Sequence, residues 1–291
     1  MELNNIIEAK NLVKMYQNTY ALDNVSLNIQ KGDIYGLVGE NGAGKTTLLR
    51  AIAKLIFPKS GILEVKENMV MTSLIEVPSL YLNRTAYDNL YYQSILLGLE
   101  TSEVDKTLEM IGIQKGSVKV KNFSLGMRQR LAVGMCIMGN PDIILFDEPL
   151  NSVDPEGIID IRNLIKKINE EYGTTIIISS HGLEELSKVA NRYGFMRQGK
   201  VIKEITKEEI AKSCGSYLSI KVPDANLAAE AIGNKFIFGK VNDTTINVKG
   251  DVSVTEVVKV LNDAGINIES INTQTIGIEN YYIQLMRSYH E

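Results

Sequence analysis

Apolar residues in the first two thirds of the chain form short continuous runs that alternate with segments of helical spacing. The run at residues 33–38 stops at a glycine-rich turn, and residues 47–56 then carry apolar side chains at helical spacing until Pro58 blocks a further turn. Residues 143–146 and 175–178 are short β-branched runs, which favour buried parallel strands. This alternation predicts an α/β domain with a largely parallel sheet.

A helix-rich stretch interrupts the alternation at about residues 85–139. Thr85 followed by Asp88 has the spacing of a helix cap, so we expect the first helix of the stretch to begin there. We interpret the stretch as a helical subdomain within a first domain that covers residues 1–212.

The pattern changes near Cys214, and the rest of the chain follows the order β-α-β-β-α-β. The six segments lie at residues 217–222, 226–233, 236–241, 244–248, 254–264 and 266–271. A last helix is expected at residues 278–287. We therefore predict a small α+β domain of ferredoxin-like order at residues 215–291.

Turn and cap residues fit these segments. Asn242-Asp243 is a reasonable two-residue hairpin turn between the second and third strands. Ser253 and Glu256 have capping-box spacing at the start of the second helix, and Gly265 fits its end. These signals predict where the chain reverses in the small domain.

Composition and charge narrow the class of protein. The formal net charge of −4 leaves no broad cationic surface, so we expect no nucleic-acid partner. Cys136 and Cys214 lie far apart without a CxxC pattern, which favours a reducing compartment over a disulfide framework or metal site. No apolar run approaches the roughly 18 to 20 residues of a membrane-spanning helix, and the first residues are not typical of a signal peptide. If the protein serves a membrane, another chain must supply the pore.

A phosphate-binding motif follows the apolar run at residues 33–38. Its residues fit the pattern G-x-x-x-x-G-K-[ST] and are Gly39, Glu40, Asn41, Gly42, Ala43, Gly44, Lys45 and Thr46, with Thr47 next. Glycines let the backbone wrap around phosphate groups, and the following helix adds its positive N-terminal end. Lys45 would supply a cation to the terminal phosphates, and the Thr46 hydroxyl is a hard oxygen ligand for Mg²⁺. We assign all of these residues except Glu40 to the binding of a nucleoside triphosphate.

Two carboxylates stand at the end of the hydrophobic run at residues 143–146. Asp147 and Glu148 would lie at the carboxyl end of a strand, where ligands bind in open α/β sheets. We expect Asp147 to hold Mg²⁺ and Glu148 to orient and polarise the attacking water. The pair predicts hydrolysis of the nucleotide.

These motifs, with the segments between them, resemble the nucleotide-binding subunits of ABC transporters over nearly all of residues 3–210. Residues 123–130, Phe-Ser-Leu-Gly-Met-Arg-Gln-Arg, resemble the LSGGQ stretch of that family. Residues 151–154 resemble the loop after the catalytic glutamate, and residues 179–181 resemble the segment of the switch histidine. Tyr16 matches the aromatic residue that stacks on adenine. The resemblance implies a P-loop ATPase domain of the ABC type, with a parallel sheet core and a helical subdomain, that hydrolyses ATP with Mg²⁺.

The resemblance also implies a role for each matched residue. Ser124 and Gly126 would begin a helix whose N-terminus binds a γ-phosphate. In the family that phosphate belongs to the opposite subunit, so two copies should form a homodimer with two ATP molecules between them. Asp154 lies in the loop that crosses between subunits, and His181 would contact the γ-phosphate. A separate membrane permease is implied, with this subunit on the cytoplasmic face of the membrane.

Two stretches depart from the family pattern. Leu125 and Met127 replace a glycine and the glutamine of the LSGGQ stretch, while the serine and the other glycine remain. Most members have a glutamine between the core and the helical region, where this chain has Glu76. Gln93 is an alternative, but it falls inside the predicted helix. We assign the position to Glu76, as a metal ligand and catalytic residue, because a carboxylate can ligate Mg²⁺.

A glutamate at this loop, the Ser-Leu-Gly-Met-Arg-Gln-Arg stretch and a small C-terminal domain look most like the ATPase subunits of bacitracin-type and lantibiotic-immunity exporters. A general drug or ion exporter remains open. A soluble ABC ATPase of translation or DNA repair is the alternative, but such proteins typically carry two cassettes, a long coiled coil or zinc-binding cysteines. A regulator that binds ATP without hydrolysis is disfavoured by Asp147, Glu148 and His181.

Overall fold

The structure is a computed structural model that describes residues 5–76, 78–151, 153–214, 216–233, 235–250, 252–275 and 278–288. It divides the chain into two compact units, Met1–Lys207 and Glu208–Glu291. The boundary predicted at residue 212 lies inside helix α7 (Lys207–Cys214). Within the described ranges, no helix combines the length and apolar character needed to cross a bilayer.

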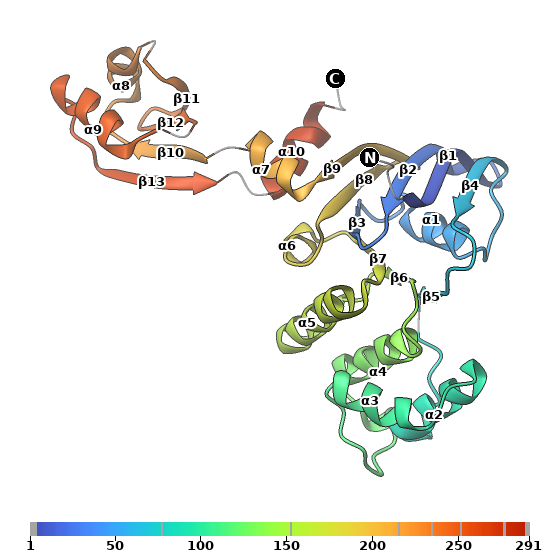
Figure 1. Cartoon of the computed structure of the whole chain (residues 1–291). Helices are drawn as coiled ribbons and strands as arrows, with labels where there is room; N and C mark the ends of the chain where they lie inside the picture. Colours follow the sequence, from blue (N-terminus) through green and yellow to red (C-terminus); the bar gives the residue numbers. More distant parts are fainter. Residues whose placement is uncertain are drawn as a thin grey trace. The chain divides into compact units, whose positions relative to one another are not determined.

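A six-stranded sheet forms the centre of the first unit (Figure 1). The strands are β3 (Ile34–Val38), β5 (Met71–Leu74), β6 (Ile143–Asp147), β7 (Thr175–Ser180), β8 (Arg192–Arg197) and β9 (Lys200–Thr206). Their order is β5-β6-β7-β3-β8-β9, and every neighbouring pair is parallel except β8 and β9. This confirms the predicted α/β class with a largely parallel sheet.

The strands predicted around residues 33–38, 143–146 and 175–178 are β3, β6 and β7. The helix predicted at residues 47–56 is α1 (Lys45–Ile52), so it begins and ends earlier than expected. It begins at Lys45 because Gly44, with φ 104°, reverses the chain as the N-cap. It ends before Lys54, whose φ of 59° is left-handed and therefore stops the helix long before Pro58.

A second sheet packs beside the first. Strands β1 (Asn5–Tyr16), β2 (Thr19–Gln30) and β4 (Ser60–Val65) form an antiparallel sheet in the order β2-β1-β4. One core cluster joins buried residues from this sheet, such as Ile7 and Leu27, with Leu37 and Leu145 of the parallel sheet and Leu48 of α1. This shared core fixes the loop after β3 between the two sheets.

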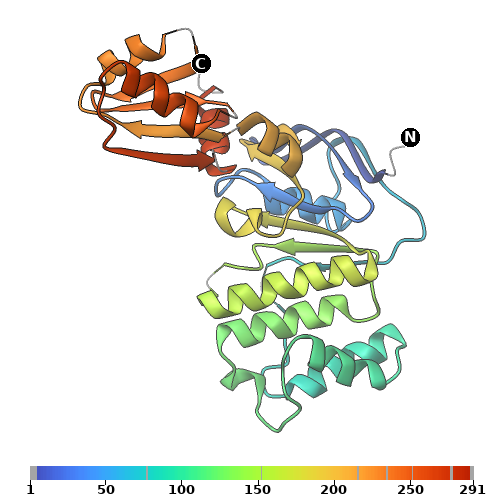
Figure 2. The same ribbon diagram turned by 60° about the vertical axis from the view of Figure 1, so that its left-hand side comes forward.

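Helices fill the region between β5 and β6 and also follow β6 and β7. They are α2 (Ala86–Leu97), α3 (Ser102–Met110), the 3-10 turn η1 (Val120–Asn122), α4 (Leu125–Ile137), α5 (Pro155–Tyr172) and α6 (Leu183–Ser187). The expected cap of α2 is confirmed, since Asp88 N donates to Thr85 Oγ1 (3.0 Å) and Thr85 N donates to Asp88 Oδ2 (3.0 Å). Helices α4 and α5 lie side by side in both ribbon views (Figures 1 and 2).

The second unit has the order predicted for it. Its elements are β10 (Ser216–Lys221), α8 (Ala225–Ile232), β11 (Ile237–Asn242), β12 (Thr245–Lys249), α9 (Val254–Asp263), β13 (Ser270–Thr275) and α10 (Ile278–Ser288). The sheet is antiparallel with the strand order β11-β12-β10-β13, which is the ferredoxin-like order. Ile220 and Val248 of the sheet pack with Ile232 of α8 and Val257 of α9 in a core of their own.

Three local predictions in this unit were wrong: the position of the hairpin turn, the capping box of α9 and the start of β13. The hairpin turn is Asp243-Thr244, one residue later than predicted, because Asn242 pairs with Thr245 and its Oδ1 accepts from Thr244 N (3.0 Å). Ser253 is the N-cap of α9, but its side chain makes no cap bond, so the capping box is absent.

Strand β13 begins four residues after the start predicted at residue 266. Gly265, with φ 74°, does end α9 as expected, and the turn then extends further. Ile266 N donates to Leu261 O (2.9 Å) and Gly265 N donates to Asn262 O (2.9 Å), so both backbone groups are used in closing the helix. The strand can begin only after this turn.

Candidate nucleotide-binding site

The loop between β3 and α1 encloses a lysine side chain. Strand β3 is buried at every position and ends at Val38. Lys45 is only 6 % exposed, and its Nζ donates to Gly39 O (2.7 Å) and Glu40 O (3.2 Å). The ammonium group therefore binds the two carbonyl groups at the start of the loop, and the loop backbone encloses it.

Two glycines of the loop leave no room for a side chain. A Cβ at Gly39 would lie 2.3 Å from Met196 O, and one at Gly44 would lie 2.3 Å from Ala21 O. Gly44 also has φ 104° and Gly42 has φ 82°, both in the region that favours glycine. Glycine is thus needed here for close backbone packing as well as for the loop conformation. The same wrapping can present N–H groups to phosphate.

Two hydroxyl groups hold Asp147 at the end of β6. Thr46 Oγ1 donates to Asp147 Oδ2 (2.7 Å), and Ser179 Oγ donates to Asp147 Oδ1 (2.5 Å). Ser179 Oγ also accepts from Glu148 N (3.0 Å), so β6 and β7 are joined across the site. The role of Ser179 was missed from sequence, although its place just before His181 was visible.

The oxygen atoms of Thr46 and Asp147 fit Mg²⁺. Both are hard donors already in contact, and Mg²⁺ is typically held by one or two protein oxygens together with waters and substrate phosphates. No cluster of three or more His, Cys, Asp or Glu side chains suited to a metal exists among the described residues. This donor set therefore suits a metal that arrives with a nucleotide.

Glu148 lies between a cation and an imidazole. Its Oε1 is 3.3 Å from Lys45 Nζ, and its Oε2 is 2.6 Å from His181 Nδ1. Its φ of 51° is left-handed, which costs about 1 kcal/mol or more for a residue with a side chain. This strained conformation and its two partners give the carboxylate a defined position at the mouth of the loop. It is placed to accept a proton from a water molecule there.

Tyr16 ends β1 with 45 % of its surface exposed. Lys14 Nζ lies 5.6 Å from the centre of its ring. The β1–β2 hairpin that carries Tyr16 also carries Ala21, whose carbonyl oxygen faces Gly44 of the phosphate loop. An exposed ring on this hairpin is available for stacking on a flat base.

Ser124 and Gly126 stand at the start of α4. Ser124 is the N-cap, and its Oγ accepts from Met127 N (3.1 Å). Gly126 is buried, and a Cβ there would lie 3.0 Å from Asp154 Oδ1 and 3.5 Å from Val153 Cγ1. Packing against the start of α5 in the same chain therefore accounts for the glycine, while Ser124 and the N-terminus of α4 face outward. Ser152, in the same loop as Asp154, lies outside the described residues.

Glu76 lies past the end of β5 and contacts Arg50 of α1 through Oε1 and Nη2. Its side chain is 61 % exposed, and its φ is 69°. Arg50 was not among the residues singled out from the sequence, although it stands four positions after Thr46 on a helix. Asn41 is exposed at the rim of the loop, and Thr47 follows in α1.

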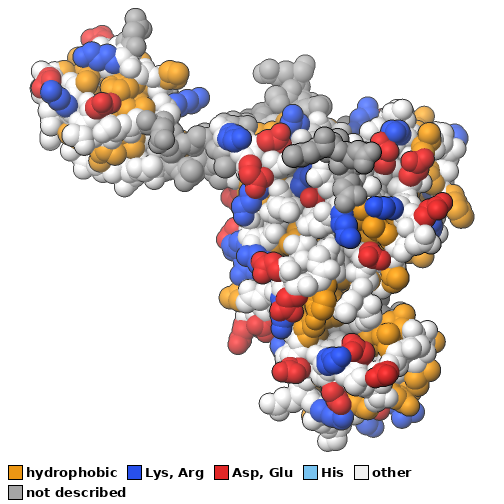
Figure 3. All heavy atoms as spheres, viewed as in Figure 1, with side chains coloured by type: hydrophobic (Ala, Val, Ile, Leu, Met, Phe, Trp, Pro, Cys, Tyr) orange, Lys and Arg blue, Asp and Glu red, His pale blue; other side chains and the backbone are white. Residues whose placement is uncertain are grey.

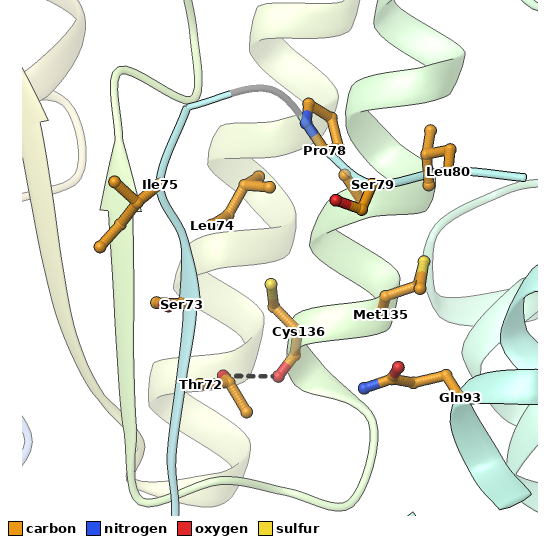
Figure 4. Close-up of a pocket in the computed structure, with 11 residues that line it drawn as sticks. Thr72, Ser73, Leu74, Ile75, Pro78, Ser79, Leu80, Gln93, Met135 and Cys136 are labelled. Carbon is orange, nitrogen blue, oxygen red and sulfur yellow. Dashed lines mark hydrogen bonds between the residues drawn. The ribbon is translucent and has the colours of Figure 1, made fainter. Parts of the chain in front are cut away.

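Gln93 belongs to α2, as the sequence indicated. Figure 4 shows it reaching from that helix into a pocket of about 370 Å³, toward Thr72 and Cys136. The pocket also includes Ile75 and Pro78, which flank the loop of Glu76. Gln93 and Glu76 therefore reach different surroundings, the first the helical region and the second α1.

Comparisons with known proteins indicate the family of this chain. The family model described as ABC transporter matches residues 22–151. The bacitracin transport ATP-binding protein BcrA of Enterococcus faecalis is 36 % identical over 97 % of this chain and 96 % of its own. The lantibiotic transport ATP-binding protein SrtF of Streptococcus pyogenes is 39 % identical over 68 % of this chain and 90 % of its own. A dimeric structure of the ATP-binding cassette MJ0796 in a post-hydrolysis state, bound to ADP and Pi, aligns with a TM-score of 0.60 and 25 % identity over 69 % of this chain and 98 % of that one.

A glycine-rich loop follows the buried strand β3, and Asp147 and Glu148 stand at the end of β6, two strands away in the sheet. This arrangement defines a P-loop ATPase. The chain belongs to the ABC transporter family of such proteins, as an ATP-binding subunit that hydrolyses ATP and works with a membrane permease. The resemblance noted from the motifs alone is thereby confirmed.

Proposed function

We propose that this subunit drives export of peptide antibiotics, of the bacitracin or lantibiotic kind, through a separate membrane permease. The observation that carries the proposal is the extent of the similarity to the bacitracin transport protein of Enterococcus faecalis. It covers 97 % of this chain and therefore includes much of the ferredoxin-like unit as well as the ATPase unit. A second bacitracin transport protein, from Bacillus licheniformis, is 33 % identical over 98 % of this chain.

The proposed reaction uses residues that are already in contact. ATP would enter the loop of residues 39–46, with Tyr16 against its base, and Lys45 would turn from its carbonyl partners to the phosphates. Mg²⁺, held by Thr46 and Asp147 with Glu76 nearby, would neutralise charge on the phosphates. Glu148 would orient a water molecule and take its proton, while His181 holds the carboxylate in position.

The site would be completed by a second copy of the chain. Because Ser124 and Leu125 at the start of α4 are exposed, Ser124 and the N-terminus of this helix are available to bind a γ-phosphate held in the loop of another copy. Asp154, packed against Gly126, would lie at the same contact. In this homodimer ATP is part of the interface, so hydrolysis would release the two copies from each other.

Exposed apolar side chains in the second half of α2 support a protein partner at the membrane. Tyr91, Ile95, Leu96 and Leu97 are 36 %, 58 %, 79 % and 41 % exposed, and hydrophobic side chains are visible on this part of the surface (Figure 3). An apolar surface of this kind is typical of an interaction site. We place the permease here, which would hold the subunit at the cytoplasmic face of the membrane.

Growth inhibition in the source organism tests the proposal. A strain whose chromosomal copy carries Glu148→Gln should become more sensitive to bacitracin or to a lantibiotic, because the permease loses its ATPase. A strain with Glu170→Gln, an exposed acid on α5, is the matched control and should keep normal resistance. Unchanged sensitivity to every peptide antibiotic in the Glu148→Gln strain would contradict this cargo.

A further inference from the structure

We propose that Arg50 is a positioning residue for the nucleotide reaction, because it holds and neutralises Glu76 beside the phosphate-binding loop. The proposal rests on the proposed role of Glu76 near Mg²⁺ and the γ-phosphate. It adds a residue outside every motif recognised in the sequence, and it explains how this chain accommodates a carboxylate at that position.

The sheet topology brings three carboxylates to one edge. Strands β5 and β6 are parallel neighbours, and Leu74 pairs with Phe146. Asp147 follows Phe146 directly, and Glu148 and Glu76 each come two residues after a member of this pair. All three acidic residues therefore leave the same carboxyl edge of the sheet, where a triphosphate would add further negative charge.

Glu148 and Glu76 each have one cationic partner at this edge. Lys45 Nζ lies 3.3 Å from Glu148, while Arg50 contacts Glu76. Lys45 would be drawn to the phosphates when nucleotide binds, so it cannot also compensate Glu76. Arg50 is therefore the cation available to offset the charge of Glu76 in the bound state. Its planar guanidinium suits a carboxylate, and it keeps its charge at every ordinary pH.

The position of Arg50 links this pair to the metal ligands. Arg50 stands one helical turn after Thr46 on α1, which puts the two side chains on the same face about 6 Å apart along the axis. Thr46 in turn touches Asp147. The Arg50–Glu76 contact therefore starts one helical turn from the Thr46–Asp147 contact.

The backbone of Glu76 needs an anchor. Its φ of 69° is uncommon for a residue with a Cβ, and such conformations persist where surrounding contacts fix them. The contact with Arg50 ties the end of β5 to a rigid helix through a side chain that is 61 % exposed. Arg50 would therefore limit the positions that the carboxylate can reach around the phosphates.

A double-mutant cycle in nucleotide affinity tests this proposal. The chains compared are wild type, Arg50→Gln, Glu76→Gln and the double variant, and the readout is binding of a fluorescent ATP analogue in Mg²⁺ and in EDTA. We expect Arg50→Gln to weaken binding about 10-fold when Glu76 is present, since an uncompensated carboxylate repels the phosphates. In the Glu76→Gln background the same change should matter by no more than about 3-fold, because little negative charge remains to offset.

Two control variants separate this role from general effects. Arg50→Lys keeps the charge and should retain most of the affinity, while Lys54→Gln removes an exposed charge just after the same helix and should leave binding unchanged. Thermal unfolding of each variant without nucleotide checks that the fold is intact. An equal loss for Arg50→Gln in both backgrounds, or no loss in either, would overturn the proposal.

The proposed function of Glu76 can fail separately. If Glu76→Gln alone leaves both the Mg²⁺ dependence and the ATPase rate unchanged, Glu76 has no part in the reaction, whatever its coupling to Arg50. If Glu76→Gln alters them while the cycle shows no coupling, only the role of Arg50 is wrong.

Discussion

Replacing Glu148 by glutamine is expected to lower steady-state ATP turnover by at least about 10²-fold while nucleotide binding survives. Glutamine keeps the size of the side chain and can still bond to Lys45 and His181, which now flank the carboxylate at 3.3 and 2.6 Å. It cannot take a proton from water. The loop of residues 39–46 is unchanged, so the nucleotide should still bind.

Phosphate release at saturating ATP and Mg²⁺ measures this turnover, and titration with a fluorescent ATP analogue measures binding. Glu170→Gln is the control for the loss of one negative charge, and it should behave as wild type. A Glu148→Gln chain that retains turnover within a few fold of wild type would remove Glu148 from the reaction. A chain that loses binding as well would indicate a structural role instead.

Lys45→Ala should weaken nucleotide binding by about 10²-fold. Lys45 is buried, and its ammonium group would bind the terminal phosphates in place of Gly39 O and Glu40 O. Charge-assisted hydrogen bonds contribute about 1.5–3 kcal/mol each, and about 1.4 kcal/mol corresponds to a tenfold change in affinity. Two such bonds to phosphate therefore account for the expected loss.

The matched control for Lys45→Ala is Lys54→Ala, since Lys54 is exposed and lies just past the end of the same helix. Both variants are titrated with the same ATP analogue, and their unfolding temperatures are compared with and without nucleotide. Only Lys45→Ala should lose stabilisation by ATP. Equal affinities for the two variants would show that the loop binds phosphate without its lysine.

Local sequence patterns predicted those parts of the fold that depend on near neighbours along the chain. Strand β3 is buried at every position and strand β6 is apolar up to Phe146, and the Thr85–Asp88 cap needs only three residues of separation. Both β13 and the hairpin of the second unit were misplaced, because the closing turn of α9 and a side-chain bond of Asn242 shifted the boundaries. Where a turn ends and a strand begins depends on these hydrogen bonds, and the periodicity of apolar residues along the sequence does not predict them.

In the candidate site, too, local sequence patterns predicted the motifs but not the contacts between residues distant in the chain. The P-loop residues follow from their spacing, and the structure brings Lys45, Glu148 and His181 together. The sequence indicated a γ-phosphate contact for His181, and its contact with Glu148 was not predicted. The contact of Arg50 with Glu76 joins residues of α1 and the end of β5, and no local pattern predicts it. The left-handed backbone of Glu76 is likewise set by its surroundings, since its residue type does not favour that conformation.

The proposed reaction needs two copies that share each nucleotide, and cross-linking tests this directly. A Glu148→Gln chain with Asn41→Cys is mixed with a Glu148→Gln chain carrying Ser124→Cys, and a short thiol cross-linker is added. Cys214 is replaced by serine, while Cys136 stays inert because burial raises the pKa of its thiol to about 12.

With ATP and Mg²⁺ the mixed chains should form a covalent dimer, and either chain alone should not. The loop of one copy would then face the α4 helix of the other. If the chains bind ATP fully and no mixed dimer forms, each copy holds its nucleotide alone, and the shared-site mechanism is wrong.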